Sequence, residues 1–184
     1  MDRSILEREG AILSGHFLLT SGRHSDVYFE KFRLLENPDI LTALVSEIID
    51  SMEDVSFDYV AGPATGGMIT AYEFARQLSA RSAYIEKRDS EMGFFRDTPI
   101  GGSDSILVVD DVLTTGKSLI QSIEAIKRVT KNIKAAAVLI DRSSELNLQY
   151  PLYRGITVEA ESYSAHNCPL CKQGIELIRP GGKR

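Results

Sequence analysis

The 184-residue sequence contains no tryptophan, only two cysteines and only three histidines. Two cysteines cannot form a disulfide framework, which excludes the small disulfide-stapled secreted proteins. The longest apolar runs, residues 135–140 and 106–109, are far shorter than the roughly 20 residues of a membrane-spanning helix. Charged residues at positions 7–9 interrupt the N-terminal stretch, so nothing there resembles a signal peptide. We therefore expect a soluble, cytoplasmic protein with no membrane partner.

An excess of positive charge is also missing. Lysine and arginine total 21 against 26 aspartates and glutamates, a formal net charge of −5, which argues against a nucleic-acid partner. Hydrophobic residues at 43% and charged residues at 26% are close to globular averages and exclude a disordered or fibrous chain. The length suits one domain, and we find no internal repeat. The chain is predicted to be a single globular domain over residues 1–184, either an enzyme or a small-molecule sensor.

Short apolar segments alternate with amphipathic ones, which predicts an α/β fold. Residues 105–109 and 135–140 are apolar on both faces, as in strands of a parallel sheet covered by helices on both sides. Asn37 followed by Pro38 is a good helix start. The other expected elements are helices at 4–13, 68–78 and 118–129, and strands at 59–61, 83–86 and, at an edge, 156–160. Ligands bind at the C-terminal ends of such strands, so the loops at Gly62, Asp110 and Asp141 are candidate sites.

The strongest chemical signal is the run ILVVDDVLTTGKS, residues 106–118. A hydrophobic strand ends in Asp110 and Asp111, and a small, hydroxyl-rich turn then opens into a helix. Backbone N–H groups, hydroxyls and the helix dipole converge there into a site for a phosphate monoester. The two carboxylates suit sugar hydroxyls or a metal such as Mg²⁺, bound directly or through water. The alternative is a surface turn with solvated aspartates.

The same run contains a misleading fragment. Gly116-Lys117-Ser118 looks like the end of a P-loop, but the glycine required five residues earlier is Asp111 here. A nucleoside triphosphatase is therefore disfavoured.

These residues resemble the signature of type I phosphoribosyltransferases, which bind 5-phosphoribosyl 1-diphosphate (PRPP). Three further segments resemble the family members that act on orotate: residues 15–29 (GHFLLTSGRHSDVYF) their base-covering segment, residues 62–67 (GPATGG) their diphosphate loop, and Asp141-Arg142 the strand end that binds the orotate carboxylate. The resemblance runs from about Leu13 to Arg142 in the same order.

The resemblance implies a type I phosphoribosyltransferase fold with an N-terminal hood segment over residues 1–36, a mobile active-site loop over 86–104 and a C-terminal tail over 164–184. It implies transfer of ribose 5-phosphate from PRPP to orotate in pyrimidine biosynthesis, with Mg²⁺ held mainly through PRPP. A homodimer with a shared active site is expected. The alternatives are a purine phosphoribosyltransferase, which Arg142 and the hood argue against, and a non-catalytic PRPP-sensing regulator.

Residue roles follow from the resemblance. The PRPP-binding residues would be Asp110, Asp111, Val112, Leu113, Thr114, Thr115, Gly116, Lys117 and Ser118. The orotate-binding residues would be Thr114, Arg142, Tyr28 and Phe29, and the diphosphate loop would use Ala64, Thr65 and Gly66. The catalytic candidates are Lys87, Arg88 and Asp111. From the residues alone, Arg142 could instead form a salt bridge with Asp141, Glu145 or another acid, and the two aromatic residues could belong to the core.

The sequence also departs from the family pattern. Gly66 stands where the diphosphate loop usually carries a lysine, and Thr20 where many members have a PRPP-contacting lysine. The loop over 86–104 offers Lys87, Arg88 and Arg96 but no histidine, as in a divergent subset of the orotate-using members. Arg23 and Lys31 could supply positive charge near the diphosphate or fix the loop. These departures keep the regulator alternative open.

The two cysteines, Cys168 and Cys171, have the spacing of half a zinc knuckle, and His166 lies two residues before them. No further cysteine is present to complete a site, so we favour a structural helix cap over zinc. A disulfide is disfavoured in the cytosol. The basic, glycine-rich residues 179–184 are predicted to be a loose end.

Overall fold

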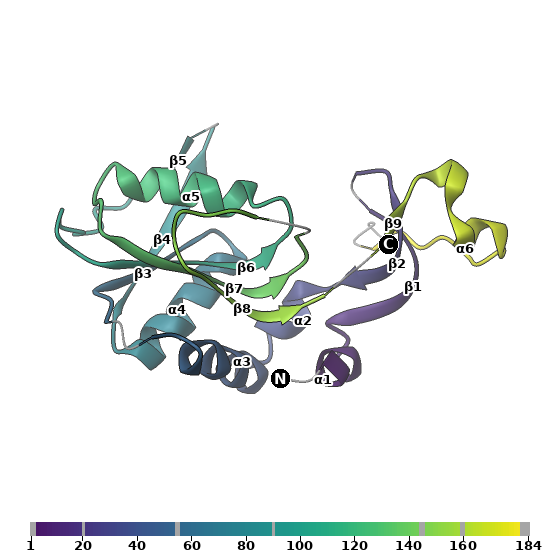
Figure 1. Ribbon diagram of the computed structural model, residues 1–184, viewed down its shortest axis with the longest axis horizontal. Coiled ribbons are helices and arrows are strands. Elements are labelled where there is room, and N and C mark those ends of the chain that lie inside the picture. The colour runs from purple at the N-terminus through teal and green to yellow at the C-terminus, as the bar shows by residue number, and fades with distance from the viewer. Residues whose placement is uncertain are drawn as a thin grey trace. The chain divides into compact units, whose positions relative to one another are not determined.

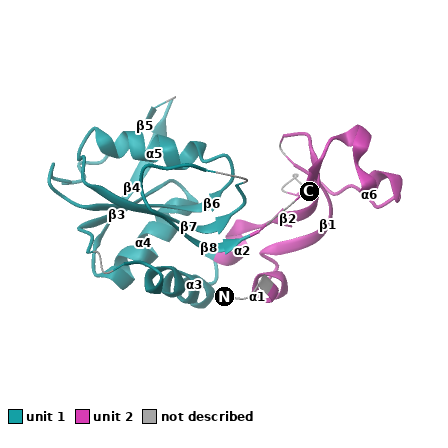
Figure 2. Ribbon diagram, viewed as in Figure 1, with its two compact units in different colours: residues 1, 35–157 teal, residues 2–34, 158–184 magenta. Residues whose placement is uncertain are grey.

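A computed structural model describes residues 3–19, 21–53, 56–89, 91–143, 146–158 and 161–180 of the chain. The chain divides into two compact units (Figure 2). Unit 1 comprises Met1 and Leu35–Thr157, and unit 2 comprises Asp2–Leu34 and Val158–Arg184. The boundary between Leu34 of unit 2 and Leu35 of unit 1 lies close to residue 36, where the predicted hood segment ends. Unit 2 thus contains most of that segment together with the predicted C-terminal tail.

Unit 1 is built on a six-stranded sheet with the order β5-β4-β3-β6-β7-β8 (Figure 1). Neighbouring strands are parallel except for the β4–β5 pair, which is antiparallel. The strands are β3 (Tyr59–Pro63), β4 (Arg81–Arg88), β5 (Glu91–Gly93), β6 (Ile106–Leu113), β7 (Ile133–Asp141) and β8 (Leu152–Thr157). The predicted fold class, a parallel sheet flanked by helices, is confirmed.

Three helices cover this sheet, with α3 (Pro38–Asp50) and α4 (Gly66–Leu78) on one face and α5 (Lys117–Lys127) on the other (Figure 1). The predicted start of α3 is confirmed, because the Asn37 side chain accepts a hydrogen bond from the Ile40 N–H at 3.4 Å and Pro38 begins the helix. The central strands are buried from both sides, as their apolar sequences require.

Unit 2 contains a three-stranded antiparallel sheet of β1 (Ile12–Leu18), β2 (His24–Phe29) and β9 (Ser162–Tyr163), in that order. Short helices complete it: α1 (Arg3–Arg8), the 3₁₀ helix η1 (Ala165–Asn167) and α6 (Pro169–Lys172), while α2 (Lys31–Leu35) crosses the unit boundary. A bridge between Phe17 and Ile178 joins the two distant segments of this unit.

Some predicted boundaries are wrong. The helix expected over 4–13 ends at Arg8, because the chain turns at Gly10, whose φ of +72° suits glycine, and Ile12 begins β1. Residues 24–26, for which no strand was predicted, belong to β2. Strand β6 continues past Val109 because its pairing with β7 extends to Leu113. The edge strand was expected over 156–160. It begins four residues earlier, at Leu152, and ends at Thr157.

Within the described part of the chain, no helix combines the length and the apolar character needed to cross a membrane.

Candidate active site at the end of β6

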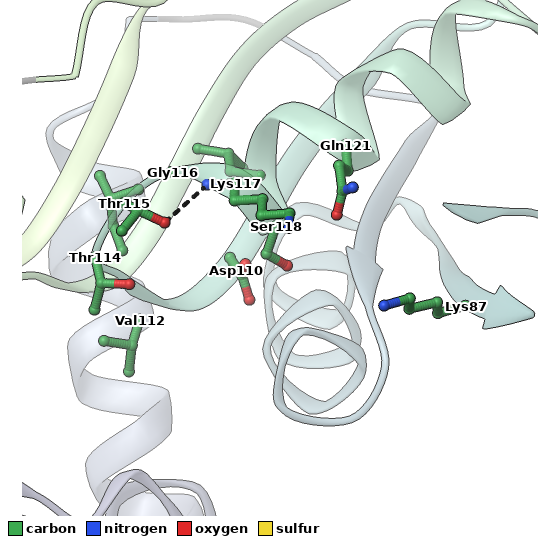
Figure 3. Close-up of a pocket in the computed structure, with 11 residues that line it drawn as sticks. Lys87, Asp110, Val112, Thr114, Thr115, Gly116, Lys117, Ser118 and Gln121 are labelled. Atoms are coloured by element: carbon green, nitrogen blue, oxygen red, sulfur yellow. Dashed lines mark hydrogen bonds between the residues drawn. The ribbon is translucent and has the colours of Figure 1, made fainter. Parts of the chain in front are cut away.

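A pocket of about 340 Å³ lies where β6 passes into α5 (Figure 3). Nearly all of its lining comes from the strand end, the turn and the first turns of α5, and one further side chain comes from β4. The lining residues are Lys87, Asp110, Val112, Leu113, Thr114, Thr115, Gly116, Lys117, Ser118, Leu119 and Gln121. Eight of the nine predicted PRPP-binding residues therefore line a single cavity; the exception is Asp111.

The turn is shaped for an anion by its backbone. Gly116 has a φ of +75°, which glycine adopts without strain, and it leads directly into α5. The Lys117 N–H approaches the Thr115 hydroxyl at 3.5 Å (Figure 3). The first N–H groups of α5 have no carbonyl partner within the helix and carry the positive end of its dipole. A phosphate group fits this combination of amides and hydroxyls.

The two aspartates extend toward opposite faces of β6, because successive side chains on a strand alternate. Each is buried, with 5% of its surface exposed. Asp110 lines the pocket next to the start of α5, where the Ser118 hydroxyl donates to its carboxylate. Asp111 instead lies beside Gly66, the first residue of α4. The strand end thus presents one carboxylate toward each of two helix N-termini.

Backbone hydrogen bonds hold both carboxylates in place. An Asp110 oxygen accepts from the Asp111 N–H at 2.9 Å, and an Asp111 oxygen accepts from the Val112 N–H at 2.7 Å. Burial, together with the charge of neighbouring Asp111, raises the pKa of the Asp110 carboxyl well above its usual range. A buried acid of this kind favours a cation or hydroxyl donors nearby, because these would offset its charge.

The loop between β3 and α4 packs against Asp111 at very short range. A Cβ atom on Gly66 would lie 1.7 Å from an Asp111 carboxylate oxygen, and one on Gly62 would lie 2.1 Å from the Gly67 carbonyl oxygen. The Ala64 N–H donates to the Ile85 carbonyl at 2.9 Å, and the Ala64–Thr65 peptide bond is cis. The backbone of this loop can therefore approach a ligand at the strand edge. A lysine at position 66 would displace Asp111.

Comparisons with known proteins identify the family. A family model described as "Phosphoribosyl transferase domain" matches residues 33–172. The chain is 38% identical over 181 residues to the orotate phosphoribosyltransferase of Desulforamulus reducens, covering 98% of this chain and 95% of that protein. It is 38% identical over 175 residues to the orotate phosphoribosyltransferase of Caldicellulosiruptor bescii, covering 95% and 92%. The chain belongs to the orotate phosphoribosyltransferase family.

Solved structures support the same assignment at the level of fold. The crystal structure of orotate phosphoribosyltransferase from Aeropyrum pernix is similar with a TM-score of 0.71 and 30% identity, covering 84% of this chain and 92% of that chain. An adenine phosphoribosyltransferase from Rhodothermus marinus is similar with a TM-score of 0.66 at 17% identity, covering 85% and 100%. The second likeness reflects the shared phosphoribosyltransferase fold alone.

The segment predicted as the mobile loop of a phosphoribosyltransferase, residues 86–104, starts as a hairpin. Strand β4 runs to Arg88 and pairs with β5 in the register Glu86↔Gly93 and Arg88↔Glu91. Further along, Met92 and Ile100 are buried in the core of unit 1. The predicted mobility of this segment stays a prediction.

The two catalytic candidates of this hairpin differ in their surroundings. Lys87 extends toward the pocket and lines it (Figure 3). The Arg88 guanidinium lies over the Phe95 ring, 4.4 Å from its centroid, and donates to the Phe95 carbonyl at 3.3 Å. Arg96 is paired with Glu86 at 3.2 Å, and this hydrogen-bonded pair lowers the pKa of Glu86. Of the three cations predicted in the loop, Lys87 alone lines the described pocket.

Arg142 follows the last residue of β7, at the same strand edge as the acids. Its N–H donates to the Leu113 carbonyl at 2.8 Å, and its side chain is half-buried. The ion pair of Asp141 is formed by Arg154 at 2.6 Å. Although burial opposes ionisation, hydrogen bonds from Ser143 and from Arg154 lower the pKa of Asp141 overall. The alternative partner Glu145 lies outside the described residues.

The predicted orotate-contacting residues of the hood belong to unit 2. Tyr28 is half-buried, with its ring 5.6 Å from that of Phe17, and Phe29 is buried. Arg23 donates from its Nε to the Ser162 hydroxyl at 2.9 Å and thereby links the β1–β2 turn to β9. This contact supports the loop-fixing role for Arg23. Thr20 lies outside the described residues.

Sequence reasoning missed Gln121 as a pocket residue. It projects from α5 into the same cavity as Lys117 (Figure 3). Residues four apart share a helix face, so the position of Gln121 relative to Lys117 was an available signal.

Proposed function

We propose that this protein transfers the ribose 5-phosphate group of PRPP to orotate, giving orotidine 5′-monophosphate and diphosphate for UMP biosynthesis. The observation that carries the proposal is the pocket at the end of β6, where Asp110 and the N–H groups of the turn and of α5 line one cavity. The names of the full-length relatives support orotate as the base. The PRPP-binding assignment of residues 110–118 rests on this geometry and on the family signature.

Each part of PRPP has a chemically matched group. The turn residues Thr114 to Ser118 would hold the 5-phosphate through N–H and hydroxyl donors. Asp110 and Asp111 would accept hydrogen bonds from the ribose hydroxyls. The loop at Ala64, Thr65 and Gly66 would meet the diphosphate with backbone groups, since no side-chain cation occupies that loop.

Mg²⁺ fits this donor set, because two buried carboxylates beside a phosphate-type pocket present the hard oxygen ligands that it prefers. When bound, mainly through PRPP, it would neutralise charge on the departing diphosphate. The raised pKa of Asp110 agrees with a site that gains from a nearby cation.

In the proposed reaction the bond from the anomeric carbon to the diphosphate oxygen breaks, and the electron pair leaves with diphosphate. A ring nitrogen of orotate, which gives its proton to the departing diphosphate or to water, forms the new bond from the opposite face, so the anomeric centre is inverted. Lys87 would stabilise the leaving group electrostatically, and Asp111 would hold the sugar as positive charge develops on it. Arg88 is assigned to the closing of the loop because it stacks on Phe95.

Arg142 is proposed to select the base, since its planar fork of donors matches the carboxylate that orotate carries and purines lack. Thr114 lines the same strand edge and is proposed to contact orotate as well. Tyr28 and Phe29 are assigned to the hood over the base. We further propose a cytoplasmic homodimer with a shared active site.

One assay tests the proposal. Protein, PRPP, Mg²⁺ and orotate are mixed, and the loss of orotate absorbance is followed, with adenine and hypoxanthine in parallel reactions. Turnover with orotate alone is expected. Turnover with a purine but not orotate would support a purine phosphoribosyltransferase, and PRPP binding without turnover of any base would support the regulator.

A further inference from the structure

Four side chains of unit 2 converge on one point outside the proposed active site. They are His16 of β1, His24 of β2, Cys168 immediately before α6, and Cys171 within α6. One ligand atom from each lies within 4.8 Å of the others. Cys168 and His16 are 152 positions apart in the sequence, so the cluster joins the two segments that form this unit.

The structure corrects the interpretation of the cysteine pair drawn from the sequence. Cys168 occupies the N-cap position of α6, but among the described residues its thiol caps no backbone N–H. Its sulfur instead lies 3.5 Å from His16 Nε2. His166, the histidine that the sequence suggested, is exposed and is not part of the cluster. The missing ligands are two histidines from the other end of the chain.

The distances between the donor atoms are close to those of a tetrahedral metal site. Cys171 Sγ lies 3.7 Å from His16 Nε2 and 3.3 Å from His24 Nδ1, and the two histidine nitrogens are 2.9 Å apart. Zinc bonds of about 2.3 Å to sulfur and 2.0–2.1 Å to nitrogen place neighbouring ligands about 3.4 to 3.8 Å apart in a tetrahedron. The two histidine nitrogens must move slightly apart, and because every pair lies within 4.8 Å the four atoms need only small movements to surround one ion.

The hydrogen bonding of His16 supports coordination. Its Nδ1 is 2.8 Å from the Ile175 carbonyl oxygen, which can only accept, so Nδ1 carries the proton. Nε2 is then unprotonated and directs its lone pair at the cluster. A backbone carbonyl that fixes the tautomer from the second ring nitrogen is the usual outer partner of a metal-bound histidine.

Burial and charge select the ion. His16 and Cys168 are each 1% exposed and His24 is 5% exposed, so three of the four ligands are buried, while Cys171 lies at the exposed edge of the cluster. Two thiolates and two neutral imidazoles around a divalent cation leave no net charge to bury. Mixed sulfur and imidazole ligands in a tetrahedron are typical of zinc.

We propose that His16, His24, Cys168 and Cys171 bind one zinc ion that fastens the C-terminal segment to the β1–β2 hairpin. All four positions of the tetrahedron are filled by protein, so the site is structural and leaves none for substrate. Unit 2 is built from two separate segments with short elements, and a metal is a common way to stabilise so small an assembly.

Zinc content is the first test. Untagged full-length protein is reduced, loaded with zinc, dialysed against metal-free buffer and analysed by elemental mass spectrometry beside Cys171→Ser and the matched control His166→Ala. We expect about one zinc per chain in wild type and His166→Ala. Loss of an outer partner weakens metal binding by about 10- to 100-fold. Cys171→Ser removes a ligand itself, so we expect its zinc affinity to fall by more than this and its zinc to be lost in dialysis. A zinc content at background level in the wild type, or equal zinc contents in Cys171→Ser and His166→Ala, would overturn the proposal.

A second measurement needs no variant and no enzyme activity. Co²⁺ added to the reduced, metal-free wild-type chain should give intense visible bands and sulfur-to-cobalt charge transfer, the spectrum of a tetrahedral site with thiolate ligands. Weak bands of octahedral Co²⁺ without charge transfer would reject the site. Neither test measures turnover, so the results of both are independent of the proposed function.

Discussion

The two units of this protein build their sites in opposite ways. In unit 1 the pocket comes mainly from one continuous run, residues 110–121, in which a strand, a glycine turn and a helix start follow one another. In unit 2 the four clustered ligands come from both ends of the chain. The first design depends on backbone geometry and survives as a recognisable sequence motif. The second depends on side chains brought together by folding, and it leaves only the Cys-x-x-Cys half visible in the sequence.

The sharpest test of the backbone-built site is Gly66→Ala. The new Cβ would lie 1.7 Å from the Asp111 carboxylate, so the carboxylate or the loop must move, and a displacement of about 1 Å costs roughly 100-fold in rate. We expect kcat/KM for PRPP to fall by about 100-fold. Steady-state kinetics with varied PRPP measure this.

The control for that variant is Gly101→Ala, whose Cβ would have the Asp104 side chain as its nearest neighbour, at ordinary contact distances of 3.6 Å and above. We expect it to keep wild-type kinetics. The zinc content of Gly66→Ala should stay at the wild-type level, because its change is confined to unit 1. Unchanged kinetics in Gly66→Ala would contradict the assignment of the diphosphate loop.

Arg142→Ala tests base selection. Loss of a charge-assisted contact to the orotate carboxylate should raise the KM for orotate by about 10- to 100-fold, while the KM for PRPP changes little. Arg154→Ala is the matched control, since Arg154 pairs with Asp141 on the neighbouring strand. Equal increases in both KM values for Arg142→Ala would reject the assigned role.

The loop cations provide a smaller, internal contrast. Lys87 lines the pocket whereas Arg88 stacks on Phe95, so Lys87→Ala should lower kcat by about 10- to 100-fold and Arg88→Ala by much less. Single-turnover kinetics separate the chemical step from loop opening. A larger loss in Arg88→Ala would mean that the catalytic arrangement of the loop differs from the described one.

The smallest expected effect concerns stability and pH. A carboxyl whose pKa in the folded protein is raised above its unfolded value stabilises the fold at low pH, and this contribution is lost as the pH rises through about 7. Asp110→Asn should therefore match wild type below about pH 4, gain on wild type as the pH rises toward 7, and be more stable by about 1 to 3 kcal/mol at pH 8. Urea unfolding of the free protein at several pH values measures the difference.

Asp58→Asn is the companion with the opposite sign. Hydrogen bonds from the Ser105 backbone and hydroxyl lower the pKa of Asp58, so its contribution is present at neutral pH and is lost as the pH falls through that lowered pKa. This variant should be less stable than wild type at pH 7, by an amount that shrinks in acid. If the stability difference from wild type followed the same pH trend in Asp58→Asn and Asp110→Asn, the pH dependence would not come from Asp110.

Most of unit 1 could be predicted from the sequence because its signals are local. The doubly apolar strands, the Asn37-Pro38 helix start and the motif at 106–118 each act within a short window. Even there, which helix each of Asp110 and Asp111 faces, and the contact of Asp111 with Gly66, follow from packing against two helices. The difference between Lys87 and Arg88 likewise comes from the β4–β5 hairpin and Phe95.

Unit 2 was predicted less well. Its β1–β2 hairpin was missed because polar residues such as His24 and Ser25 interrupt the expected alternation, although both are buried in the structure. The role of His16 and His24 could not be derived from spacing, since their partners lie some 150 positions away.

The sequence by itself determined the class of the fold, the family and the glycine turn between β6 and α5, because strand apolarity, glycine conformation and helix starts are properties of neighbouring residues. Tertiary structure alone decided which carboxylate faces which helix and which loop cation reaches the pocket. It also decided that two histidines meet two cysteines. Those outcomes depend on distances between residues far apart in the chain, which only the folded backbone sets.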